Sequence, residues 1–92
     1  MIHQPDASPV RPKQVEELEV NEVDDGLVIY QRRPERVHYL NSTASLVFEL
    51  CTGEHSPEDI ARLLGLAFAL VEPPSDEVQT CLQQLRSLGV VA

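Results

Sequence analysis

The sequence HYLNSTASLVFELCTGEHSPEDIARLL, residues 38–64, constrains the fold more than any other stretch, because a short strand pattern passes straight into two helix patterns. Asn41-Ser42-Thr43 breaks the strand and can cap a helix, since each side chain offers an oxygen to unpaired backbone N–H groups. Gly53 is expected to end that helix at the C′ position. Ser56-Pro57 then begins another helix, with a capping serine before a proline at the first helical position. The segment holds no pattern typical of catalysis, so it predicts architecture before chemistry.

Apolar residues in both helix patterns recur three and four positions apart, which predicts one buried face on each helix. The loop EPPSDE, residues 72–77, separates the second helix from a third, for which Ser75 is the expected cap. The third apolar stripe ends at Gly89. The predicted buried residues are Ala44, Val47, Phe48 and Cys51 in the first helix, Ile60, Leu63, Leu64, Ala67 and Phe68 in the second, and Val78, Cys81, Leu82, Leu85 and Leu88 in the third.

Three short strand patterns precede the helices. LEVNEV (18–23) alternates as a half-buried strand does, LVIYQ (27–31) is β-branched and aromatic, and VHYL (37–40) is a short third strand. DDG at 24–26 is a hairpin-turn signal, and Pro34 interrupts the chain before the third strand because it cannot donate to a ladder. Strands followed by helices predict an α+β fold with a three-stranded antiparallel sheet and three helices. A helix pair beside a β-hairpin is also the layout of a winged helix.

Charge disfavours two classes of partner. The 92 residues carry a formal net charge of −8, with 15 acidic against 7 basic residues. Affinity for nucleic acid comes largely from Lys and Arg that neutralise phosphates, so this charge disfavours a nucleic-acid partner and, equally, an anionic membrane surface. The longest apolar run, residues 63–71, is also far shorter than the roughly 20 residues that a membrane helix needs.

Residues 1–14 contain three prolines among polar residues, a composition typical of a flexible N-terminal segment. Residues 15–92 are expected to form one small domain. The start of the chain, MIHQPDASPVRPK, lacks the continuous apolar stretch of a signal peptide, and two cysteines fit reduced core thiols better than a disulfide framework. We therefore expect a cytoplasmic protein.

The side chains that could carry chemistry are scattered along the sequence. His3, His38 and His55 show no metal-ligand spacing with one another or with Cys51 and Cys81, so neither a metal site nor a cofactor is predicted. The serines before the helices fit capping positions, and no nucleophile is paired with a base. We therefore expect a protein that is not an enzyme.

The stretch YLNSTASLVFELCTGEHSPEDIARLL (39–64) combines a strand that ends in Leu-Asn, a Ser/Thr-Ala helix start, a Gly turn and a Ser-x-x-Asp/Glu-Ile-Ala helix. In this pattern the chain resembles the PqqD-like family, the pyrroloquinoline quinone biosynthesis D proteins and related RiPP recognition elements, which serve ribosomally made, post-translationally modified peptides. The tail VQTCLQQLRSLGVV (78–91) is similar to the family's last helix. The likeness extends from about Glu17 onward, and the EPPSDE loop is not diagnostic of quinone synthesis, so the resemblance implies a peptide system without specifying its precursor.

The resemblance implies a non-catalytic peptide chaperone. In such domains the leader segment of a precursor peptide adds as a strand beside the third strand, lies against the third helix and is presented to a modifying enzyme, commonly a radical S-adenosylmethionine enzyme. An edge strand suits this role because its unpaired N–H and C=O groups can bind an extended peptide. The implied peptide-binding residues are Arg36, Val37, His38, Tyr39 and Leu40 on the strand, and Val78, Cys81, Leu82, Leu85 and Arg86 on the helix.

Simpler roles and other functions compete with this interpretation. The stripe of the third helix is first of all a core stripe, with Leu82 and Leu85 the favoured groove residues. Val37, Tyr39 and Leu40 are also expected mainly to pack, so the strand's backbone matters more than its side chains. A winged-helix nucleic-acid-binding protein and a regulatory subunit of a partner enzyme are the alternatives. Asp76 and Glu77 disfavour the first of these, because they stand at the start of the expected recognition helix and would repel phosphate.

Overall fold

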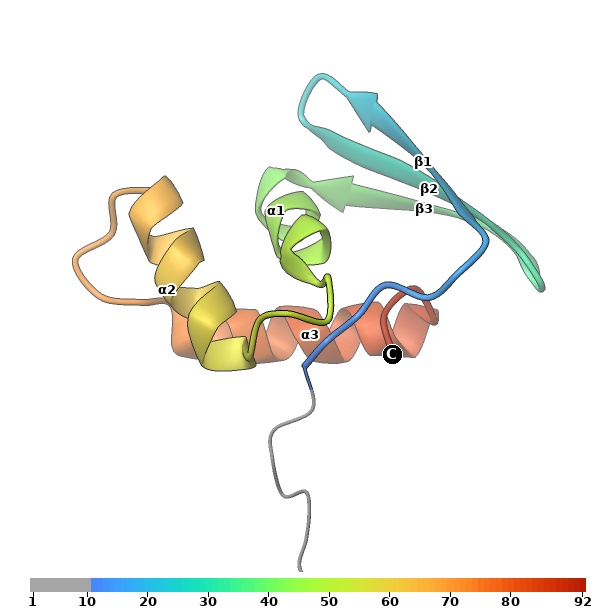
Figure 1. The fold of residues 1–92 in the computed structure, drawn as a ribbon. Coiled ribbons are helices and arrows are strands. Elements are labelled where there is room, and N and C mark those ends of the chain that lie inside the picture. Colours follow the sequence, from blue (N-terminus) through green and yellow to red (C-terminus); the bar gives the residue numbers. More distant parts are fainter. Residues whose placement is uncertain (1–10) are drawn as a thin grey trace, which may run out of the picture.

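A computed structural model describes residues 11–92, which form three strands followed by three helices (Figure 1). The strands are β1 Leu18–Val23, β2 Gly26–Arg32 and β3 Glu35–Asn41, and the helices are α1 Ser42–Leu50, α2 Pro57–Ala67 and α3 Ser75–Leu88. Both strand pairs are antiparallel, and the order across the sheet is β1-β2-β3. The α+β fold predicted from the sequence is therefore confirmed.

The hydrophobic core lies between the sheet and the helices. Leu27 of β2 and Leu40 of β3 are opposite each other in the ladder, so their side chains share the face that is covered by the helices, and both are buried. Phe48 of α1 is also buried, and burying a side chain of this size stabilises a fold by roughly 1.5–3 kcal/mol. The other buried apolar residues are Ile29, Val47, Cys51, Ile60, Ala61, Leu64, Val78, Leu82, Leu85, Val90 and Val91.

Strand β1 lies largely outside this core, which differs from the half-buried strand that the sequence pattern predicts. Val20 shares a face with Ile29 in the ladder, yet it is 40% exposed. The physical reason is that α1 packs against β2 and β3, so the outer strand extends beyond the helical layer. Only Leu18 of β1 packs against the core.

The first two helices begin where the sequence predicts. The Asn41 side-chain oxygen accepts a hydrogen bond from the Ala44 N–H at 2.9 Å, so Asn41 is the cap among the three polar residues at 41–43. Ser56 and Asp59 form a reciprocal capping box, in which each side chain accepts a hydrogen bond from the other residue's backbone N–H. These bonds fix the path from β3 into α1 and from α1 into α2.

Two other helix ends differ from the sequence prediction. Pro74 is the capping residue of α3, Ser75 is the first helical residue, and no side-chain hydrogen bond caps this helix. Helix α1 is capped at Cys51, and Gly53 adopts its positive φ of +88° two residues later rather than directly after the cap. Gly89 follows α3 with a positive φ of +82°, as the prediction requires.

The chain before the sheet is packed where it is described. Of the flexible segment expected at residues 1–14, residues 1–10 lie outside the described residues. Pro12 is buried, and its carbonyl oxygen accepts a hydrogen bond from the Gly53 N–H at 2.9 Å. The Gln14 N–H donates to the Cys51 oxygen at 2.9 Å. Pro12 and Gln14, which the sequence analysis placed in the flexible segment, therefore pack against the chain at the end of α1.

Candidate functional site

Strand β3 forms one edge of the sheet. Its inner side pairs with β2 along its whole length, from Glu35 to Asn41. Among the described residues 11–92, no backbone hydrogen bond joins its outer side to another segment. Lys13 and Gln14 do not cover this edge, since Lys13 bridges to Thr52 and Gln14 to Val91. The N–H and C=O groups of an open edge are available to an incoming extended chain.

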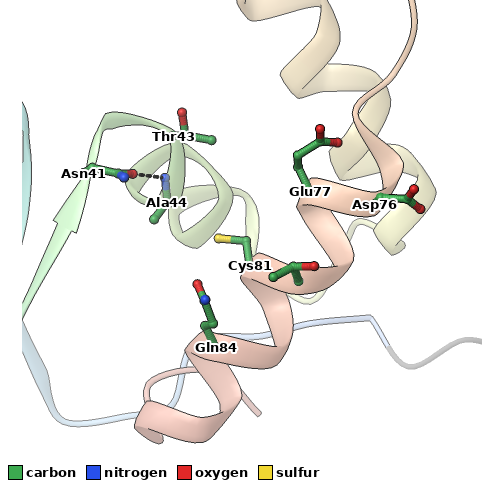
Figure 2. A pocket seen from close by; sticks show the side chains of 8 residues that line it. Asn41, Thr43, Ala44, Asp76, Glu77, Cys81 and Gln84 are labelled. Carbon is green, nitrogen blue, oxygen red and sulfur yellow. Dashed lines mark hydrogen bonds between the residues drawn. The ribbon is translucent and has the colours of Figure 1, made fainter.

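A groove runs between the C-terminal end of β3, at Tyr39 to Asn41, and α3. It consists of two adjoining hollows of about 370 Å³ and 230 Å³. Both hollows share four lining residues, Asn41, Ala44, Cys81 and Gln84, so they form one continuous surface. In Figure 2, Cys81 and Gln84 of α3 are directed toward the start of α1, where the Asn41 side chain caps Ala44. The open strand edge and the groove therefore lie side by side.

The predicted strand residues divide between the two faces of the sheet. Leu40 is buried, and its carbonyl oxygen accepts a hydrogen bond from the Ser45 hydroxyl at 3.0 Å. Val37 and Tyr39 are 60% and 56% exposed, so they are not the packing residues that the simpler interpretation expected. The Tyr39 hydroxyl reaches the β1–β2 turn, 3.5 Å from the Asp25 carbonyl oxygen, and a hydrogen bond with the Asp25 side chain raises the pKa of the tyrosine.

His38 belongs to a small polar network that links the sheet to the end of α3. Its Nε2 lies 3.0 Å from the side-chain oxygen of Gln31, whose amide nitrogen donates to the Gly89 carbonyl oxygen at 3.2 Å. Arg36 is exposed near the opposite end of β3, beside Tyr30 and Gln31. Neither His38 nor Arg36 lines the groove.

The predicted helix residues are mostly core residues. Val78 and Leu82 are 1% and 0% exposed, so neither lines the groove. Leu85 is 1% exposed and reaches the groove only at its floor, whereas Cys81 is half-buried and lines both hollows. Arg86 points elsewhere, because its guanidinium donates to the Ala92 oxygen at 3.3 Å. The largest apolar side chains of α3 fill the hydrophobic core. They are therefore buried beneath the groove that the sequence prediction expects them to line.

The α3 residues that do line the groove form a second stripe. Glu77, Cys81, Gln84 and Leu88 lie at spacings of four, three and four, and all four line one or both hollows. Since an α-helix turns by roughly 100° per residue, this stripe is about a quarter turn from the core stripe. The helical spacing could have identified it, but its mixed polarity gave no hydrophobic signal. Thr43, Asp76 and Thr80 complete the polar end of the groove.

The groove carries its charge at one end. Tyr39 and Leu88 line one hollow, whereas Asp76 and Glu77 place two carboxylates in the other. Burial raises the pKa of the Cys81 thiol between them, so this cysteine is a protonated, weakly polar wall at neutral pH. No group of three or more metal-ligating side chains gathers within residues 11–92.

Comparisons with known proteins agree with this geometry. Residues 26–91 match the family model for coenzyme PQQ synthesis protein D (PqqD), and the chain belongs to that family. A solved structure, described as lasso peptide synthetase B1 complexed with the leader peptide, is similar at a TM-score of 0.72 and 25% identity. The alignment covers 89% of this chain and 98% of that one. The comparison with curated proteins found no match. Across residues 11–92, every helix is too short or too polar to cross a membrane.

Proposed function

We propose that this chain is a RiPP recognition element, which binds the leader segment of a ribosomally made precursor peptide by strand addition. The observation that carries the proposal is the open edge of β3 beside the groove against α3. Support comes from membership of the PqqD family and from the similar solved structure, whose title names a bound leader peptide.

Two kinds of contact would divide the work of binding. The exposed backbone of β3 would hold an extended peptide through main-chain hydrogen bonds, which give affinity with little demand on sequence. The groove would add selectivity, because alternate side chains of an added strand point to one face. The side chains that would touch the guest are Ala44, Cys81, Gln84 and Leu88.

The bound leader would serve a separate modifying enzyme. We infer that the chain itself is non-catalytic and that it presents the peptide to an enzyme such as a radical S-adenosylmethionine maturase in the cytoplasm. Support comes from the family match and from the similar structure, whose title names a lasso peptide synthetase and a leader peptide. The product would be a peptide natural product or a quinone cofactor.

A matched pair of glutamines tests the groove. Gln84 lines both hollows, whereas Gln83 is exposed on another side of the same helix. Gln84→Trp would fill the groove and should weaken leader binding at least about tenfold, which corresponds to ~1.4 kcal/mol. Gln83→Trp adds the same ring outside the groove and should bind like wild type. Isothermal titration with a synthetic leader peptide, selected by a search of the neighbouring genes for a short precursor, measures both variants.

Hydrogen exchange tests the strand edge separately. In an antiparallel edge strand, successive backbone groups point alternately inward and outward. Addition of the leader should therefore protect every second amide between Glu35 and Asn41. The proposal is overturned if the Gln84→Trp and Gln83→Trp variants bind the leader equally well. It is also overturned if the leader protects only amides of α2 from exchange.

A further inference from the structure

The most exposed apolar surface of the described chain lies at the end of α2, away from the groove lining. Leu66, Phe68, Leu70 and Val71 are 72%, 44%, 49% and 100% exposed, and we call these four residues the α2 turn patch. The sequence pattern assigned Ala67 and Phe68 to the buried face of α2, yet both are exposed. Four large apolar side chains within six positions form an exposed cluster of the kind that marks an interaction site.

The backbone beneath the patch has a defined structure. The Leu70 N–H donates to the Gly65 carbonyl oxygen at 2.8 Å, and the Ala69 N–H donates to the Leu66 oxygen at 3.3 Å. Ala69 has a positive φ of +55°, so the turn is a Schellman-type helix end built without glycine. A non-glycine residue in this conformation costs roughly 1–2 kcal/mol, a cost that the fold accepts here.

Packing holds the following residues against the same helix. Gly65 is buried, and a Cβ added there would lie 3.4 Å from the Cα of Pro73 and 3.6 Å from a ring carbon of Pro74. The Ser75 N–H donates to the Pro73 oxygen at 2.9 Å, which leads directly into α3. The patch therefore lies on a turn whose backbone is held by hydrogen bonds and by packing. Ordering this turn for a partner would cost little conformational entropy.

The charges around the patch indicate the chemistry of its partner. Glu72 follows the patch directly, and Asp76 and Glu77 lie in the first turn of α3. All three side chains are exposed. The nearby Arg62 is already paired with Asp59 at 3.1 Å. A complementary surface would be an apolar hollow with a basic rim, since opposite charges at a rim steer and orient association. A second copy of this chain fits poorly, because each copy carries a net charge of −8.

The patch lies outside the groove. None of its four residues lines either hollow, and Figure 1 shows the α2–α3 loop on the side of the molecule away from the sheet. We infer that the α2 turn patch docks the modifying enzyme through an apolar, basic-rimmed surface of that enzyme, while a leader peptide occupies the groove. This inference rests on the function proposed above and adds the position of the second partner.

Paired titrations separate the two proposals. The probes are a purified candidate modifying enzyme of the radical S-adenosylmethionine class and a synthetic candidate leader peptide, each selected by a search of the neighbouring genes. Val71→Asp, at a fully exposed position, should weaken association with the enzyme at least tenfold and leave the leader Kd within twofold of wild type. Val23→Asp makes the same change at an exposed valine of β1 and serves as the matched control for both titrations. Glu72→Lys, which reverses the rim charge, should also weaken the enzyme complex.

The results distinguish failure of one proposal from failure of the other. If Val71→Asp and Glu72→Lys bind the enzyme as tightly as Val23→Asp does, the docking site is overturned, while the proposed leader binding stands. If the wild-type chain itself does not bind the leader, the proposed function is overturned instead. Sedimentation that shows a wild-type dimer abolished by Val71→Asp would assign the patch to a second copy and overturn its assignment to the enzyme.

Discussion

At the scale of single residues, two features of this protein are energetically unusual. Ala69 and Glu17 are non-glycine residues with positive φ, at +55° and +65°. Cys51 is fully buried, and its thiol donates to the Val47 carbonyl oxygen at 3.1 Å. Each feature has a cost that depends on the surrounding fold, so each can be tested by one substitution.

Ala69→Gly should stabilise the fold. Glycine accepts the left-handed conformation without the Cβ clash that alanine suffers there, so the free energy of unfolding should rise by about 1 kcal/mol. Urea denaturation measures the change. Ala67→Gly makes the same substitution at the last residue of α2, where the backbone is helical and glycine should not stabilise the fold. A decrease for both variants would show that position 69 does not carry the strain.

Cys51 makes stability fall at high pH. Burial is the main cause that raises the pKa of its thiol to about 11 from the ordinary value of 9.0. Between pH 9 and about 11 the unfolded chain releases the thiol proton, whereas the folded chain retains it. The stabilisation by the neutral buried thiol is therefore complete below pH 9 and is lost as the pH rises toward 11. Urea midpoints across this window should fall less steeply in Cys51→Ala than in wild type. Parallel slopes would contradict this account.

At the scale of elements, local sequence signals predict most of the structure, and packing decides the rest. The caps at Asn41 and Ser56 depend on side-chain oxygens three residues from their donors; the Ser56 cap is confirmed, and Asn41 is one of the three capping residues that the sequence offered. Ser75 meets the same local rule, but the packing of Pro73 and Pro74 against Gly65 sets the start of α3 instead. A cap can be predicted locally only where no tertiary contact competes with it.

The groove was predictable to a lesser degree. The edge position of β3 follows from strand order, but the sequence stripe of α3 identifies the residues that fill the core. The neighbouring stripe of Glu77, Cys81, Gln84 and Leu88 becomes recognisable only after the core side of the helix is known. The previously favoured residue Leu82 is 0% exposed, so Leu82→Asp would unfold the domain rather than test the site.

At the scale of the whole molecule, the two ends of the described chain stabilise each other. The Val15 N–H donates to the Val90 oxygen at 3.0 Å, and the Ala92 N–H donates to the Lys13 oxygen at 2.8 Å. The Gln14 side chain also donates to the Phe48 carbonyl oxygen at 2.9 Å, which connects this pairing to α1. A proline-rich composition alone could not predict this packing, because it depends on contacts between residues far apart in the sequence, from Gln14 with Phe48 to Lys13 with Ala92.

Pro12→Ala should therefore destabilise the domain although it lies outside every helix and strand. The buried ring would be replaced by a methyl group, and the lost burial should reduce the free energy of unfolding by roughly 1–2 kcal/mol. Thermal and urea denaturation measure this loss. Glu16→Ala, at an exposed position of the same stretch, should change stability by less than about 0.5 kcal/mol. Equal stability of Pro12→Ala and wild type would show that this stretch does not support the fold.

The unpaired border of β3 has a consequence for handling the protein. Such a border accepts any extended polypeptide, including the same border of a neighbouring molecule, and the pairing can continue into aggregates. Mutual repulsion of molecules with a charge of −8 opposes this at neutral pH. Near the isoelectric point of about 4.6 the repulsion vanishes. Solutions kept well above that pH, or saturated with a cognate ligand, will hold the protein in its dispersed form.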